Sequence, residues 1–184
     1  MTRRTMTALF AGCALAFASG AARAADGAPV LMIGDSMMRL LGIAMEKELN
    51  AAGVAPAATF SSLASGLARM DAFDWFAKVD ELMKQHKPAT VVVSLGANDR
   101  QSLKDSTGRV VPFGQPDWER EYGLRVGRIM DELIKGGATR VVWLLLPDMK
   151  EPAQQEYAQS VNALFKRAAA TETRGDVWFK GVVN

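Results

Sequence analysis

The stretch TVVVSLGAND, residues 90–99, decides the fold of this chain. Its first six residues, 90–95, form a continuous apolar and largely β-branched run, which is typical of a parallel strand covered on both faces. Gly96 follows at once, and the polar pair Asn98-Asp99 comes directly after it. The stretch therefore predicts a central strand of an α/β protein, with polar side chains presented at the carboxyl end of that strand.

Outward from this strand, short apolar runs alternate with segments of helical spacing in both directions. The predicted strands are 30–33, 54–61, 90–95, 140–146 and 177–183, and the predicted helices are 36–50, 72–85, 117–135 and 153–170. Asp117 is the expected N-cap of the third helix, and 100–116 is expected to be the longest loop. This alternation predicts one α/β domain, a three-layer α/β/α sandwich around a five-stranded parallel sheet.

The first 24 residues are typical of an export signal. Arg3 and Arg4 form a basic start, residues 8–18 form a short apolar run, and Ala22-Arg23-Ala24 matches a cleavage site. The apolar run is shorter than the roughly 20 residues that span a bilayer. We expect residues 1–24 to be a signal peptide, 25–184 to be the mature domain, and the protein to be periplasmic or secreted. The route, general or twin-arginine, stays open.

Removal of this signal changes the charge of the chain. The whole sequence has 22 Lys and Arg against 20 Asp and Glu, a net charge of +2. Three of the arginines lie within the signal, so the mature domain has 19 basic and 20 acidic residues, a net charge of −1. Nucleic acid is therefore not an expected partner. The chain has one Cys, Cys13, and one His, His86, which excludes a Cys-rich or His-cluster metal centre.

Three strand ends carry residues suited to acyl transfer. Gly34-Asp35-Ser36 follows the first strand, with Gly34 allowing a tight turn and Ser36 at the start of a helix, where partial positive charge stabilises an oxyanion. The Asn98 amide and the Gly66 N–H are further candidate donors on the next two loops. Taken singly, each has a plainer interpretation: a serine N-cap, an Asn-Asp turn and a turn glycine. Together, a hydroxyl and three donors on successive loops indicate an acyl-transfer site.

These motifs resemble the first three sequence blocks of the SGNH (GDSL-type) hydrolase superfamily: Gly34-Asp35-Ser36, an oxyanion glycine at Gly66, and Gly96-Ala97-Asn98-Asp99. Within it, the chain resembles an exported bacterial group through segments 65–69, 73–75, 96–101 and 118–122. The resemblance covers about residues 29–170. It implies a flavodoxin-like sheet, the SGNH hydrolase fold, with strand order 2-1-3-4-5.

The resemblance also implies an activity, that of a serine ester hydrolase or O-acyltransferase. Ser36 would be the nucleophile, and its N–H, the Gly66 N–H and the Asn98 amide would form the oxyanion hole. Gly34, Asp35, Gly96 and Asp99 would support them. No metal and no organic cofactor are implied, and the expected substrates are acyl or acetyl esters of envelope or exported polysaccharide.

Three more residues are candidates for substrate binding. Arg100, beside the third block, could hold a carboxylate or phosphate of the substrate, or form an ordinary surface ion pair. Trp75 and Trp118 could line a sugar-binding cleft or lie at the edge of the core, because an amphipathic ring suits both places.

The chain departs from the superfamily in its last block. An Asp-x-x-His after the fifth strand would supply the general base, and the sequence contains none. His86 precedes the third strand, about 20 Å from its carboxyl end at ~3.3 Å per residue. Two interpretations stay open: a C-terminally shortened enzyme, or an inactive protein of this fold that binds acylated glycan or acts as a scaffold. Self-association through the edge of the fifth strand is also expected.

Overall fold

The computed structural model describes residues 29–54 and 57–171 of the 184-residue chain. Within them, the predicted strands and helices alternate in the expected order, and two further short strands, β4 and β5, lie in the predicted long loop. The elements are β1 (Val30–Gly34), α1 (Ser36–Ala51), β2 (Ala57–Ser61), α2 (Trp75–His86), β3 (Thr90–Ser94), β4 (Leu103–Lys104), β5 (Val110–Val111), α3 (Pro116–Lys135), β6 (Arg140–Trp143) and α4 (Pro152–Thr171).

The long strands form one parallel sheet in the order β2-β1-β3-β6. This order matches the first four positions of the expected 2-1-3-4-5 arrangement, and the α/β class is confirmed. The fifth strand, expected at 177–183, lies outside the described residues, as do the signal peptide and the predicted self-association edge. β1 and β3 pair in register from Val30↔Thr90 to Gly34↔Ser94, so both strands end at the same level.

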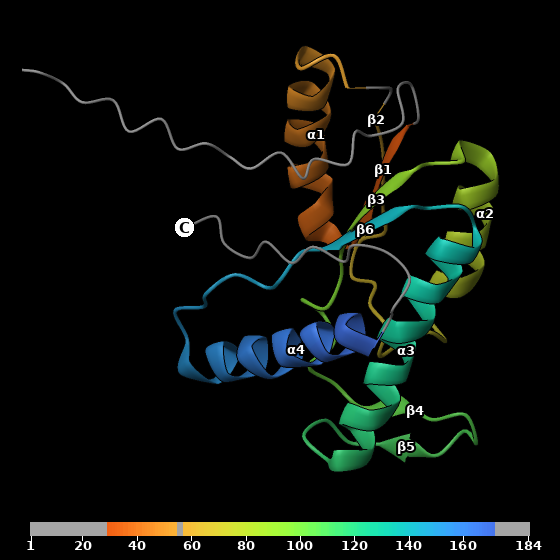
Figure 1. The fold of residues 1–184 in the computed structure, drawn as a ribbon. Helices are drawn as coiled ribbons and strands as arrows, with labels where there is room; N and C mark the ends of the chain where they lie inside the picture. The colour runs from red at the N-terminus through yellow and green to blue at the C-terminus, as the bar shows by residue number, and fades with distance from the viewer. Residues whose placement is uncertain (1–28, 55–56, 172–184) are drawn as a thin grey trace, which may run out of the picture.

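Helices cover both faces of this sheet (Figure 1). Side chains alternate between the two faces along a strand. Met32 and Val92 therefore pack with Met38 of α1, whereas Leu31 and Val93 point to the opposite face. That second face is covered by α2 and α3, and α4 packs against α3 and contacts Trp143 of β6 through Phe165. The result is a three-layer arrangement, with α1 on one side of the sheet and α2 and α3 on the other.

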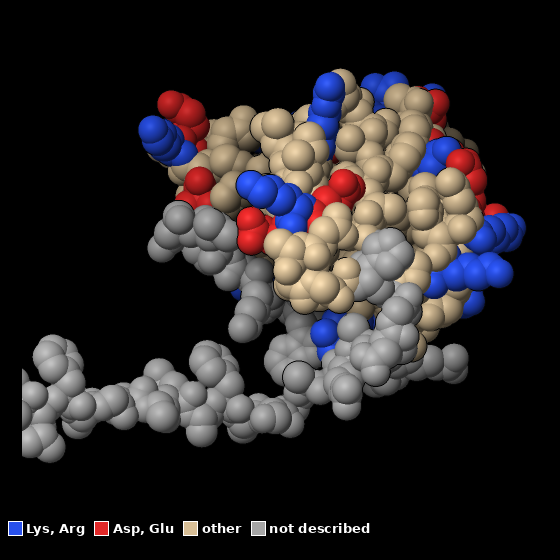
Figure 2. Space-filling model, turned by 90° about the horizontal axis from the view of Figure 1, so that it is seen from above, with Lys and Arg blue, Asp and Glu red and all other residues tan. Residues whose placement is uncertain are grey.

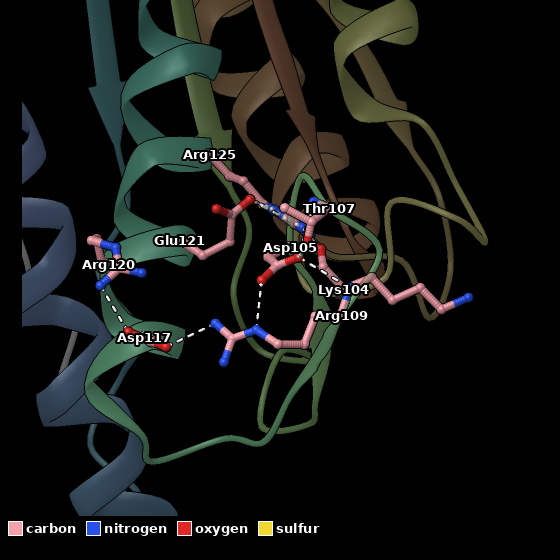
Figure 3. A network of polar contacts seen from close by, with 8 residues as sticks. All are labelled: Lys104, Asp105, Thr107, Arg109, Asp117, Arg120, Glu121 and Arg125. Atoms are coloured by element: carbon pink, nitrogen blue, oxygen red, sulfur yellow. Dashed lines mark hydrogen bonds and ion pairs between the residues drawn. The ribbon is translucent and has the colours of Figure 1, made fainter.

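The start of α3 differs from the sequence prediction. The N-cap is Gln115, in an extended conformation and without a side-chain capping bond, and Pro116 is the first helical residue. Proline is favoured there because its fixed φ suits a helix and its missing N–H would have no intrahelical acceptor. Asp117 therefore lies in the first turn, where it pairs with Arg109 and Arg120 (Figure 3). The prediction of Asp117 as the N-cap was wrong.

The predicted long loop contains a small antiparallel hairpin of β4 and β5. Leu103 and Val111 are buried on one side of it. Nearer the turn of the hairpin, Arg109 joins the Asp105 carboxylate to that of Asp117 and so links the hairpin to α3 (Figure 3). Two strands of two residues each are too short to produce a hydrophobic period, which is why the sequence pattern missed them.

The face shown in Figure 2 carries acidic and basic side chains interspersed among uncharged ones, and no broad area of one sign stands out among the described residues there. Within 29–54 and 57–171, no helix combines the length and the apolar character needed to cross a bilayer.

Candidate active site

Ser36 is the first residue of α1, directly beyond the end of β1. The helix is capped by its neighbour: Oδ1 of Asp35 accepts a hydrogen bond from the Met37 N–H at 2.9 Å. Ser36 is exposed, and its hydroxyl has no hydrogen-bond partner in the part of the chain that the structure describes. The plainer interpretation of Ser36, that of an N-capping serine, therefore does not apply, because Asp35 takes that role.

The Asp35 carboxyl group itself is almost completely buried. Its second oxygen, Oδ2, has no hydrogen-bond partner among the described residues. Burial raises the pKa of Asp35, because a charged carboxylate loses the solvation that water would give it. The group faces the interior while Ser36 faces solvent, so Asp35 fixes the start of the helix and the hydroxyl stays accessible.

Hydrogen bonds join the three strand-end loops to one another. The Asp35 N–H donates to the Ser94 carbonyl at 3.0 Å, which ties the end of β1 to the end of β3. The Ser62 N–H donates to the Gly34 carbonyl at 3.0 Å, which ties the β2 loop to β1. The Asn98 amide, Nδ2, donates to the Ser65 carbonyl at 2.9 Å, which ties the loop after β3 to the loop after β2. The structure thus brings the segments of Ser36, Gly66 and Asn98 to one edge of the sheet.

The donors at this edge can be divided into those with an acceptor and those without one. In the described part of the chain, neither the Ser36 N–H nor the Gly66 N–H has a protein acceptor. Asn98 uses one of its two amide hydrogens on Ser65 and keeps the other. The segment from Gly96 to Asp99 is also a turn, closed by a 3.2 Å bond from the Asp99 N–H to the Gly96 carbonyl. These donors lie on the strand-end loops that meet at the edge of the sheet where Ser36 lies.

Asp99 lies beneath this edge and is completely buried. Its Oδ2 accepts hydrogen bonds from the Leu67 N–H at 3.0 Å and the Tyr122 hydroxyl at 2.7 Å, and its Oδ1 accepts one from the Ala68 N–H at 2.8 Å. Burial raises the pKa of Asp99, and these hydrogen bonds act in the opposite direction. The carboxylate therefore braces the loop that carries Gly66.

Gly96 occupies the turn between β3 and Asn98. Its φ of +121° lies in the region that only glycine adopts readily. A Cβ atom at this position would lie 2.8 Å from Cζ of Phe165 on α4. The Tyr157 hydroxyl, also on α4, donates to the Gly96 carbonyl. Two residues of α4 therefore contact the loop after β3 and help to fix its position.

Sequence reasoning missed Arg125 of α3. Its guanidinium donates to the Leu67 carbonyl at 2.7 Å and the Ala68 carbonyl at 3.3 Å, and also to the Lys104 carbonyl. It pairs with Glu121, one turn earlier on the same helix (Figure 3). Because these acceptors are backbone carbonyls up to 58 residues away, no side-chain motif could reveal them.

The two candidate tryptophans lie in the core. Trp75 and Trp118 are both completely buried. Trp75 donates its indole N–H to the Ser65 hydroxyl at 3.2 Å, and Trp118 donates to the Gln101 carbonyl at 2.8 Å while stacking on Tyr122. Such rings have no surface left to offer a carbohydrate, so the suggestion that they line a sugar-binding cleft was wrong. Their indole groups support the two loops from below.

Arg100 and His86 lie where the sequence placed them. Arg100 is exposed, next to the Asn98 loop, and its part in substrate binding stays a prediction. His86 is the last residue of α2 and precedes β3, at the opposite end of that strand from Asn98. Among the described residues, no three His, Cys, Asp or Glu side chains gather closely enough to hold a metal ion.

The fold and this edge define a parallel α/β protein in which, within residues 29–54 and 57–171, a serine and several hydrogen-bond donors at the carboxyl ends of the strands have no protein partner. The chain belongs to the DUF459 family, described as a protein of unknown function, whose family model matches residues 29–180. A search of curated proteins found no match.

Solved structures show a distant likeness. The lipase Lip_vut3 from a goat rumen metagenome is 13% identical with a TM-score of 0.44, over 82% of this chain and 79% of that one. An NAD-bound protein of the short-chain dehydrogenase/reductase superfamily from Agrobacterium tumefaciens is 13% identical with a TM-score of 0.41, over 83% of this chain. This chain spans about half (47%) of that second protein. Neither likeness bears on activity.

Proposed function

We propose that this protein is a serine-dependent ester hydrolase or O-acyltransferase of the SGNH type, with Ser36 as the nucleophile. The observation that carries the proposal is the capping of α1 by Asp35, which leaves the exposed Ser36 hydroxyl unengaged. The hydroxyl lies at a helix N-terminus, where the partial positive charge favours a developing anion. Catalytic serines need this combination of access and electrostatic support.

The chemistry follows from the available donors. The Ser36 oxygen attacks the ester carbonyl carbon while its hydroxyl proton passes to water, and the carbonyl electron pair moves to the carbonyl oxygen. The N–H groups of Ser36 and Gly66 and the free hydrogen of Asn98 stabilise that oxyanion. Collapse of the tetrahedral intermediate breaks the ester C–O bond and leaves an acyl-serine, and the departing alkoxide takes a proton from water to leave as the alcohol. Water then completes hydrolysis, or a second hydroxyl accepts the acyl group in transfer. Loss of one such donor typically costs about 10²–10³ in rate.

The proposed substrates are acyl or acetyl esters of envelope or exported polysaccharide, met in the periplasm or outside the cell. Arg100 is exposed beside the Asn98 loop, so a carboxylate or phosphate on the glycan can reach its guanidinium. The export signal expected at residues 1–24 supports this location. Neither a metal nor an organic cofactor has a part in the proposed reaction.

Ester hydrolysis by the 184-residue protein tests the proposal. The substrates are p-nitrophenyl acetate and an acetylated polysaccharide, and the variants are Ser36→Ala and, as a matched control, the exposed Ser102→Ala. We expect Ser36→Ala to abolish turnover above background and labelling by a fluorophosphonate, and Ser102→Ala to leave both unchanged. An extension with an Asp-x-x-His segment should raise the rate at least ~10³-fold. Equal turnover in wild type and Ser36→Ala would contradict the proposal.

A second candidate function is binding without turnover, by an inactive protein that holds acylated glycan or serves as a scaffold. It is favoured by the position of His86, the single histidine of the chain, at the opposite end of β3. This function predicts measurable affinity for an acetylated glycan, unchanged in Ser36→Ala, together with no Ser36-dependent hydrolysis. Calorimetry with the acetylated and deacetylated glycan separates the two functions.

A further inference from the structure

We propose that Asp99 and Arg125 are positioning residues: together they fix the peptide groups of Leu67 and Ala68 so that the preceding N–H, that of Gly66, is presented to an anionic ligand at Ser36. The inference rests on the proposed function only for the identity of that ligand. The fixing of the loop itself follows from contacts within the protein.

Asp99 acts on the N–H side of the loop. Gly66, Leu67 and Ala68 offer three successive N–H groups, and the buried Asp99 carboxylate accepts the second and third at 3.0 and 2.8 Å. Hydrogen bonds to a charged acceptor are roughly twice as strong as neutral ones. The first N–H of the three is therefore the one that remains for a ligand, and its direction follows from the two peptide groups after it.

Arg125 acts on the carbonyl side of the same segment. Its Nη1 donates to the carbonyls of Leu67 and Ala68 at 2.7 and 3.3 Å. Its side chain is only 11% exposed, and its position is fixed further by Glu121 and by the Lys104 carbonyl (Figure 3). The carboxylate thus holds the N–H groups of two successive peptide groups and the guanidinium holds two successive carbonyls, and the Leu67–Ala68 peptide group is held from both sides. The positive charge of Arg125 also lowers the pKa of Asp99, which burial raises.

Two residues of α3, Tyr122 and Arg125, stabilise this arrangement. Tyr122 donates its hydroxyl to Oδ2 of Asp99 at 2.7 Å, and Arg125, three residues later on α3, donates to the Leu67 carbonyl of the loop. The Asp99 carboxylate therefore accepts hydrogen bonds both from the loop and from the Tyr122 hydroxyl of α3. A shift of α3 would move the loop with it, so the orientation of the Gly66 N–H depends on tertiary packing.

Two measurements on the whole protein test the inference. The first is amide hydrogen exchange at Leu67 and Ala68, followed by NMR. The second is affinity for phenylboronic acid, which adds to a serine hydroxyl and gives a tetrahedral anion whose oxygen occupies an oxyanion hole. The test variants are Asp99→Asn, Arg125→Gln and Tyr122→Phe. Asp80→Asn and Arg128→Gln, both at exposed ion pairs, are the matched controls.

Asp99→Asn places an amide donor against an N–H donor of the loop, and Arg125→Gln removes the charged donor from its carbonyls. We expect exchange at Leu67 and Ala68 to accelerate at least ~10-fold in both and boronate affinity to fall at least ~10-fold. Tyr122→Phe should give smaller changes in the same direction, and the controls none. A purely structural role would lower the unfolding midpoint and leave the boronate affinity of the folded protein unchanged.

Unchanged exchange at both amides in Arg125→Gln and Tyr122→Phe, which keep the buried carboxylate, would overturn the inference even if Asp99→Asn does not fold. Faster exchange with unaltered boronate affinity would overturn the claim that these residues orient the Gly66 N–H toward the ligand. The proposed function would still stand if Ser36→Ala abolishes boronate binding. Absence of boronate binding to the wild type would count against the proposed function, and the exchange rates would then decide whether the two residues fix the loop.

Discussion

A Cβ atom placed on Gly66 would lie 2.1 Å from Oδ1 of Asp99 and 2.7 Å from its Cγ. No side chain fits at such distances, so residue 66 is a glycine because the buried carboxylate passes directly over it. The reason is close approach, since Gly66 is not among the residues with positive φ. The same approach lets Asp99 reach the two N–H groups that follow.

Replacement of this glycine should be costly. Gly66→Ala must displace the Asp99 carboxylate, and we expect the free energy of unfolding to fall by about 1–3 kcal/mol through overpacking and weakened buried hydrogen bonds. Urea unfolding measures the change. Gly123→Ala on α3 is the control, because its Cβ would meet only Cδ2 of Leu164 at an ordinary 3.8 Å. That variant should be neutral or more stable by up to about 1 kcal/mol, and equal losses in the two would contradict the explanation.

Substitutions at the N-caps of α1 and α2 can distinguish an effect on the stability of the protein from an effect on the reactivity of Ser36. Asp35→Ala and Asp74→Ala each remove an N-cap carboxylate, of α1 and α2 respectively, and each should lower stability by about 0.5–2 kcal/mol. The loss at Asp35 should be the smaller, because its unpartnered Oδ2 is removed as well. Only Asp35→Ala should slow fluorophosphonate labelling of Ser36, since α1 starts there. Slower labelling in Asp74→Ala would show that the effect is general and not local.

The hairpin should respond to acid through Asp105. Its carboxylate accepts a 2.6 Å hydrogen bond from the Thr107 hydroxyl and further bonds from Arg109, which lower its pKa from 3.8 to about 2. Because the folded pKa lies below the ordinary value, the ionised group stabilises the hairpin above pH 3.8, and this stabilisation disappears as the pH falls through about 2. A carbon NMR titration of the Asp105 carboxyl checks the midpoint. Thr107→Val should move it toward 3.8, and a wild-type midpoint already near 3.8 would refute the prediction.

The orientation of α1 can be tested by its apolar residues. Leu40 and Ile43 are 77% and 65% exposed, whereas Met38 is completely buried against the sheet. Leu40→Glu and Ile43→Lys should therefore change the free energy of unfolding by less than about 0.5 kcal/mol and improve solubility. Met38→Ala should cost about 2–5 kcal/mol. Thermal unfolding measures the stability changes and light scattering measures solubility. A large loss of stability in Leu40→Glu would contradict the exposure of this face of α1.

Much of the fold was predictable because local sequence determines it. The apolar runs at 30–33 and 90–95 identified two strands nearly to the residue, and the helical spacing after Ser36 and before Lys135 identified α1 and α3. The failures have local causes too. Gln115 caps α3 through its backbone alone, which leaves no side-chain signature for it, and strands of two residues have no period.

The candidate site was predictable only in its outline. The motifs around Ser36, Gly66 and Asn98 follow three strands, and parallel pairing brings strand ends to one edge whatever the details of packing. Trp75 and Trp118 were open between cleft and core because an indole suits both, and burial in three dimensions decided for the core. The roles of Tyr122 and Arg125 had no signal, since their partners are a distant carboxylate and distant backbone carbonyls.

The sequence by itself determined the order of strands and helices and the serine and donors that follow the strands, because these depend on hydrophobic period and on residues adjacent in the chain. The three-dimensional structure decided which polar groups are occupied and which are free among the described residues, through a local contact at Asp35 and long-range contacts at Asp99. Asp35 caps α1 and leaves Ser36 unengaged, and Asp99 accepts from Leu67 and Ala68 and leaves Gly66 unengaged. The assignment at Gly66 depends on segments more than 30 residues apart meeting in a buried, low-dielectric space, which no local pattern encodes.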